Sequence, residues 1–162
     1  MKKVFLCMLS GLLMTTCVIA QPNSTQPSLK YTVRMPQAAQ GKFHITLDAK
    51  GFAKDTLVFK MPNWMPGYYQ LMNYAKGVDS FEAKNQQGKA LVVNKLADNT
   101  WQVIAPKKSA FTITYQVKTS RKFVANSFID RAHAYIVPAN NFLYVEGMPQ
   151  LPVKVQVNNS DQ

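Results

Sequence analysis

The residue types that most often carry catalysis are few in this chain and stand apart from one another. It has two histidines, His44 and His133, and neither begins the H-E-x-x-H sequence that places two zinc ligands on one face of a helix. A hydrolytic zinc site needs about three protein ligands and one open position. We therefore predict that this chain holds no metal, and we interpret His44 as a surface histidine on the polar face of a strand.

A second group of polar residues surrounds Asp130, with Arg131 and His133 close to it in sequence. The nearest hydroxyl, on Ser127, lacks the flanking glycines of a nucleophile elbow. The eight acidic residues of the chain are isolated from one another, so no pair of carboxylates is in place for acid–base chemistry. We expect a structural ion pair between Asp130 and a basic neighbour, and no catalytic residue in this chain.

The segment at residues 62–69 combines a rigid backbone with large aromatic side chains. Its two prolines fix φ, and its glycine permits a left-handed turn. Rigid loops that carry aromatic side chains are suited to holding a ligand or a neighbouring domain. The candidate contact residues are Trp64, Pro66, Gly67, Tyr68 and Tyr69. The simpler interpretation, which we favour from the sequence, is that Trp64 plugs one end of the fold while the Pro-Gly pair turns the chain, and the two roles could coexist.

These residues must be positioned by strands, because apolar and polar residues alternate over short runs along most of the chain. Such a period of two is typical of half-buried strands, and the turn signals between the runs have the spacing of antiparallel hairpins. The runs are 29–35, 43–47, 57–61, 78–81, 91–93, 101–103, 111–117, 134–137, 142–145 and 153–157. We predict a two-sheet antiparallel β-sandwich, with a partly closed β-barrel as the alternative.

The chain of 162 residues opens with a basic start and an apolar run, which predict a signal peptide at residues 1–20. The run is too interrupted for a stable membrane span. We expect an exported protein, periplasmic or extracellular, with a lipoprotein anchored through Cys17 as the minor alternative. A flexible lead-in at 21–28, one β-sandwich domain at 29–157 and a polar tail at 158–162 complete the predicted organisation. Both cysteines, Cys7 and Cys17, lie in the leader, so the domain is predicted to be free of disulfides.

The chain is strongly basic, with a formal net charge of +11 that falls to +9 without Lys2 and Lys3. This charge attracts anionic partners. The lysines are spread along the sequence, however, and a nucleic-acid site needs a clustered basic stripe to follow the phosphates. We expect a solvated basic surface and no nucleic-acid partner.

Several segments together resemble the N-terminal domain of the glycyl aminopeptidase family of metallopeptidases, metallopeptidase family 61. The family shows Trp-x-Pro-Gly-Ser-Tyr where this chain has Trp64-Met65-Pro66-Gly67-Tyr68-Tyr69, so Tyr68 replaces the usual serine. The other matching segments are 73–78, 81–83, Trp101, Thr114-Tyr115, 128–136 and 142–147. They extend over most of the chain from Tyr31 to Val157.

The resemblance implies a β-rich domain that precedes a thermolysin-like zinc domain, commonly followed by a PDZ domain. The family's H-E-x-x-H helix and downstream glutamate ligand have no counterpart in this sequence. Our leading hypothesis is a truncated product or fragment: the non-catalytic N-terminal domain of an exported aminopeptidase. It would pack on a zinc catalytic domain absent from this chain, and zinc is expected only there. Two alternatives are a free-standing exported module that binds a peptide or glycan, and the functionless remainder of a broken gene.

Overall fold

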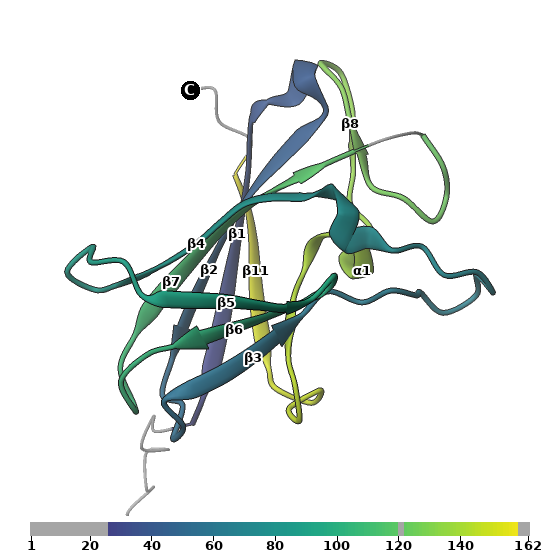
Figure 1. Cartoon of the computed structure of the whole chain (residues 1–162). Coiled ribbons are helices and arrows are strands. Elements are labelled where there is room, and N and C mark those ends of the chain that lie inside the picture. Colours follow the sequence, from purple (N-terminus) through teal and green to yellow (C-terminus); the bar gives the residue numbers. More distant parts are fainter. Residues whose placement is uncertain (1–25, 120–121, 159–162) are drawn as a thin grey trace, which may run out of the picture.

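The computed structural model describes residues 26–119 and 122–158 (Figure 1). The predicted signal peptide at 1–20 lies outside the described residues, as do residues 21–25 of the expected lead-in and 159–162 of the expected tail. The first strand begins at Ser28 and the last ends at Asn158. Strands therefore occur near both ends of the described chain, and most of them correspond to runs in which apolar and polar residues alternate.

Two sheets and a short ribbon make up the fold. The large sheet has the order β11 (Val153–Asn158), β1 (Ser28–Gln37), β2 (Lys42–Lys50), β7 (Phe111–Lys118) and β4 (Val78–Asn85). The small sheet has the order β10 (Tyr144–Val145), β3 (Thr56–Lys60), β6 (Thr100–Ile104) and β5 (Val92–Ala97). The ribbon pairs β8 (Phe128–Ile129) with β9 (Ala134–Tyr135). The short helices are η1 (Ala38–Gln40), η2 (Tyr74–Gly77) and α1 (Pro138–Asn141).

The predicted β-sandwich is confirmed, and neither of its sheets closes into a barrel within the described residues. One pairing differs from the antiparallel prediction, because β11 runs parallel to β1. The chain reaches β11 from β10, which belongs to the other sheet. A connection that crosses between sheets lacks the geometric constraint of a hairpin, so it can bring in a strand of either direction.

The core lies between the two sheets and follows directly from the alternation. In the large sheet, β2 buries every second side chain, from Phe43 to Ala49, while its other side chains face outward. The small sheet contributes Phe59 and Trp101 from the opposite layer. The ring of Trp101 stacks on that of Phe81, with centroids 5.0 Å apart, and this contact holds β4 against the small sheet.

Three tyrosine hydroxyls fasten the irregular part of the chain to this sandwich. Tyr31 donates to the carbonyl oxygen of Leu143, and Tyr115 donates to that of Asn141 over 2.7 Å. Tyr74, in η2, donates to a third carbonyl oxygen, at residue 125, also over 2.7 Å. Burial raises the pKa of both Tyr31 and Tyr115, so these phenols remain protonated donors.

Removing the buried hydroxyl of Tyr115 is expected to weaken the fold. The substitution Tyr115→Phe leaves the carbonyl oxygen of Asn141 without its partner, and should lower the free energy of unfolding by about 1–3 kcal/mol. Urea unfolding followed by circular dichroism measures this. Tyr135→Phe is the matched control, because the hydroxyl of Tyr135 is exposed and its bond to residue 124 is 3.3 Å long. Equal losses in the two variants would contradict the assigned role.

Candidate functional site

The segment singled out in the sequence forms a projecting loop between β3 and η2, which we call the aromatic loop (residues 62–73). Figure 1 shows it extending away from the body of the sandwich. Its base is closed by the backbone N–H of Met72, which donates to the carbonyl oxygen of Asn63 over 2.8 Å. Near its tip, Met65 and Tyr68 pair across a turn, with 3.3 Å between the Tyr68 nitrogen and the Met65 oxygen. The loop is therefore fixed at both its base and its tip.

Pro66 and Gly67 occupy the two central positions of the tip turn. Gly67 has φ +83°, which confirms the left-handed turn that the sequence predicted. A Pro at the first central position followed by Gly at positive φ is the sequence that type II turns favour. A Cβ built at Gly67 would meet no heavy atom within 4 Å, so only the backbone conformation demands glycine there.

One aromatic side chain of the loop anchors it to a neighbouring loop, and the other two are exposed and available to contact a partner. The ring of Tyr68 meets Phe123 edge-on at 5.2 Å between centroids, which ties the aromatic loop to a second loop. Trp64 is 46% exposed and Tyr69 is 92% exposed. Trp64 therefore does not plug the sandwich, and the buried tryptophan is instead Trp101.

The second loop, residues 122–127, was not singled out from the sequence, because its apolar residues follow no strand or helix period. Asn126 donates its backbone N–H to the carbonyl oxygen of Phe123 over 2.9 Å, which closes a tight turn. Beside this turn Val124 is 67% exposed, and Leu71 on the aromatic loop is 74% exposed. Figure 1 shows both loops projecting from the same side of the molecule, and each of them carries exposed apolar side chains.

The expected ion pair at Asp130 is confirmed, with the Lys122 ammonium 2.6 Å from its carboxylate. The backbone N–H groups of Ala132 and His133 also donate to this carboxylate. The Lys122 hydrogen bond, helped by these two, holds the pKa of Asp130 well below its usual range. Asp130 therefore stays ionised and organises its turn, as a structural residue would.

Ser127 has no arrangement that would make it a nucleophile. Its side chain is fully buried, and its hydroxyl oxygen accepts hydrogen bonds from the backbone N–H of Val137 and from the side-chain amide of Asn141. Its own backbone N–H donates to Asn140 Oδ1 over 2.8 Å. Nucleophilic catalysis requires a base within hydrogen-bonding distance of the hydroxyl. Ser127 instead holds α1 in place.

The described residues do not fit a zinc ion. No group of three or more His, Cys, Asp or Glu side chains gathers within residues 26–119 and 122–158. His44 lies on β2, where its Nε2 atom is 3.0 Å from Gln37 Oε1. Partial burial, and secondarily the charge of Lys42, lower the pKa of His44. A neutral imidazole bonded to a glutamine is one potential ligand, and the three that a zinc site needs are not assembled around it.

None of the helices in the described part of the chain has the length and apolar character needed to cross a bilayer.

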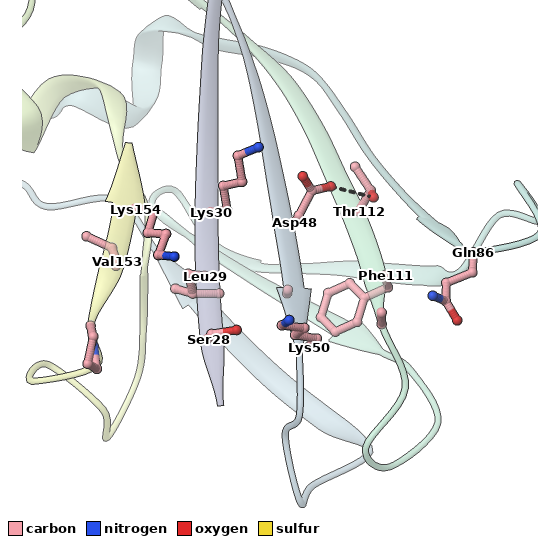
Figure 2. Close-up of a pocket in the computed structure, with 13 residues that line it drawn as sticks. Ser28, Leu29, Lys30, Asp48, Lys50, Gln86, Phe111, Thr112, Val153 and Lys154 are labelled. Atoms are coloured by element: carbon pink, nitrogen blue, oxygen red, sulfur yellow. Dashed lines mark hydrogen bonds between the residues drawn. The ribbon is translucent and has the colours of Figure 1, made fainter. Parts of the chain in front are cut away.

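A cavity with a volume of about 600 Å³ lies on the outer side of the large sheet near the start of β1 (Figure 2). Three lysines from three strands line it: Lys30, Lys50 and Lys154. Asp48 is the acidic residue of its lining, and its carboxylate accepts a hydrogen bond from Thr112 over 2.9 Å. The lysines stand far apart in sequence and are brought together only by strand pairing, so the sequence did not point to this cavity.

A smaller cavity of about 430 Å³ adjoins the base of the aromatic loop. Its walls come from η2, from the end of β7 and from Asn126 and Asn140. Gly77 allows the close approach of η2 to β7, because a Cβ there would lie 2.7 Å from the carbonyl oxygen of Lys118. The Oδ1 atom of Asn126 is buried without a hydrogen-bond partner. The cavity is thus polar and belongs to the same end of the molecule as the two loops.

Replacing Gly67 is expected to strain the aromatic loop without creating a clash. Gly67→Ala forces a residue with a Cβ into the left-handed conformation, at a cost of about 1–2 kcal/mol in the free energy of unfolding. Gly67→Asn should cost less, because asparagine enters this conformation more readily. Chemical unfolding of the two variants measures the difference. An alanine variant as stable as the wild type would show that the turn does not require glycine.

Comparison with known proteins identifies the domain. A family model described as the Peptidase M61 N-terminal domain matches residues 30–162. A solved aminopeptidase N family protein from Idiomarina loihiensis superposes with a TM-score of 0.73 at 23% sequence identity, covering 81% of this chain and 22% of that one. This likeness shows the fold, and this chain spans much less than two thirds of that protein's length. Comparison with curated proteins gave no match.

Two M1 zinc metallopeptidase structures also align with this chain, at lower similarity. One is a two-domain enzyme variant bound to L-arginine, with a TM-score of 0.39, 10% identity and coverage of 82% of this chain and 31% of that one. The other, from Deinococcus radiodurans, has a TM-score of 0.39 and 12% identity, covering 82% of this chain and 30% of that one. Neither likeness supports a conclusion about function.

Proposed function

Because this chain belongs to the Peptidase M61 N-terminal domain family, we propose that it serves as the non-catalytic N-terminal domain of an exported aminopeptidase. In this role the β-sandwich packs on a zinc catalytic domain that this sequence does not contain. The aromatic loop makes the contact and helps to frame the path by which a peptide reaches the catalytic centre.

The observation that carries this proposal is the exposure of large apolar side chains on loops that are otherwise well anchored. Trp64, Tyr69, Leu71 and Val124 are all exposed, and they come from two loops joined by the ring contact of Tyr68. Aromatic residues are enriched in the cores of protein interfaces, and preorganised loops lose little conformational entropy when a partner covers them. An apolar surface of this kind is suited to a neighbouring domain.

The described residues support a role in binding and positioning. The carboxylate of Asp130 is paired with Lys122, and the hydroxyl of Ser127 accepts a hydrogen bond that supports α1. Neither side chain is therefore available for acid–base or nucleophilic chemistry. Zinc bound in the catalytic domain would supply the Lewis acid that activates water. The part of this chain is to hold the catalytic domain at a fixed orientation and to shield one side of the substrate path from solvent.

Export is part of the proposal and is supported by the sequence. Residues 1–20 have the basic start, apolar run and small final residue of a secretory leader. Both cysteines fall within that segment, so the domain relies on its packed core for stability in an oxidising compartment. A periplasmic or extracellular peptidase domain fits these features.

The test uses a member of the family in which this domain is joined to its zinc catalytic domain. Trp64→Ala combined with Tyr69→Ala should lower kcat/KM for a short peptide by about tenfold to a hundredfold, because misplacement of the catalytic groups by about 1 Å has that effect. Val92→Ala is the control, since Val92 is 57% exposed on the small sheet, away from both loops. Circular dichroism checks that both proteins remain folded.

Unaltered kcat/KM in the folded loop variant would rule out the proposed contact. A loss of equal size in the Val92 control would assign the effect to general destabilisation, and would also count against the loop. Only a loss confined to the loop variant agrees with the proposed function.

A further inference from the structure

The large sheet has an open edge at β11. This strand is the last in the order of the sheet, and it pairs with β1 in one unbroken parallel register that runs from Val153 to Asn158. An edge strand presents backbone N–H and C=O groups that can form a new ladder with another extended chain. β11 offers six consecutive residues for such pairing.

The other sheet edges in the described residues carry features that discourage pairing. β10 has two residues. The register of β4 shifts between Asp79 and Glu82, and that of β5 shifts between Lys95 and Ala97. Short edge strands and bulges are common protections against the addition of a further strand. β11 is neither short nor bulged, and its one lysine, Lys154, disfavours only a basic strand, so this edge is the one best suited to a strand that carries acidic side chains.

One face of β11 is apolar and incompletely covered. Val153, Val155 and Val157 are 52%, 48% and 52% exposed. Their register partners on β1 are buried core residues, so the three valines continue the core outward past the point where the small sheet covers it. A further strand at this edge would bury these valines if it carried apolar side chains at every second position.

The other face of β11 carries one positive charge, at Lys154, next to two lysines of the neighbouring strands. Lys154 lies directly opposite Lys30 in the parallel register, and Lys50 lines the same cavity (Figure 2). None of these lysines forms an ion pair with any residue that the structure describes, and Asp48 nearby is hydrogen-bonded to Thr112. Like charges directly opposite one another destabilise a sheet, so a carboxylate placed beside Lys154 on the open side of β11 would be favourable.

We propose that β11 binds an extended peptide whose side chains alternate between apolar and acidic residues. The peptide adds a strand to the large sheet, its apolar side chains cover the valine row, and its carboxylates approach Lys154 and the cavity beside it. A second copy of this chain fits less well, because its own strongly positive charge repels the lysines. The site lies at the opposite edge of the sheet from β4 and stands independently of the contact proposed for the aromatic loop.

The test measures binding of a fluorescein-labelled peptide of alternating valine and glutamate, about eight residues long, to the full chain by fluorescence anisotropy. Lys154→Glu should weaken binding by about tenfold, because attraction to the peptide carboxylates becomes repulsion. Lys84→Glu is the matched control: Lys84 faces outward from the opposite edge strand, in the same cross-strand row as Thr112. It should leave binding unchanged. Hydrogen exchange should show new protection of the β11 amides in the presence of the peptide.

Several results would overturn the proposal. They are the absence of binding, equal binding of a valine–lysine peptide, equal binding of a peptide interrupted by proline, and equal weakening by the Lys154 and Lys84 variants. Association of the chain with itself through β11 in the absence of peptide would replace the proposed occupant by a second copy. Tyr69→Ala should not change binding of the peptide to β11. The test of peptide binding is therefore separable from the test of the contact between the aromatic loop and the catalytic domain.

Discussion

The buried tyrosine hydroxyls of this structure need hydrogen-bond acceptors, and this need fixes where the irregular segments of the chain lie. Tyr31 and Tyr115 lie on the inward face of the large sheet because the alternation of their strands places them there. A hydroxyl buried without a partner would cost about 1–3 kcal/mol, so each must find an acceptor. Both find it in the backbone of the segment formed by the end of α1 and the residues that follow it. That segment has little regular structure of its own, and these bonds hold it against the sandwich.

A third hydrogen bond of this kind, from the hydroxyl of Tyr74, holds the candidate site. This residue begins η2, directly after the aromatic loop, and its hydroxyl bonds to the backbone of the second loop. The ring contact between Tyr68 and Phe123 is a second link between the two loops. Both loops are therefore fixed to the same end of the sandwich, where each carries exposed apolar side chains. The edge at β11 is fixed separately, by its parallel ladder with β1.

Much of the fold was predictable from the sequence, since most of the period-two runs correspond to strands, and in β1, β2, β3, β6 and β7 they define the inward faces. The parallel direction of β11 was not predictable, because local alternation carries no information on how a chain crosses between sheets. The turn at Gly67 was predictable from its Pro-Gly pair. Phe123 and Val124 were not, since the side chains of irregular segments are positioned by contacts distant in sequence. The cavity of Figure 2 was missed for the same reason, because its lysines meet only through strand pairing.

In the proposed function, a catalytic domain covers the aromatic loop. Hydrogen exchange tests it most directly, by comparing this domain alone with the same domain joined to the zinc domain of its family. We expect slower exchange in residues 62–73 and 122–127 of the joined protein, with little change in the core strands. Exchange in both loops as fast as in the isolated domain, together with new protection elsewhere, would contradict the claim and move the interface to another surface.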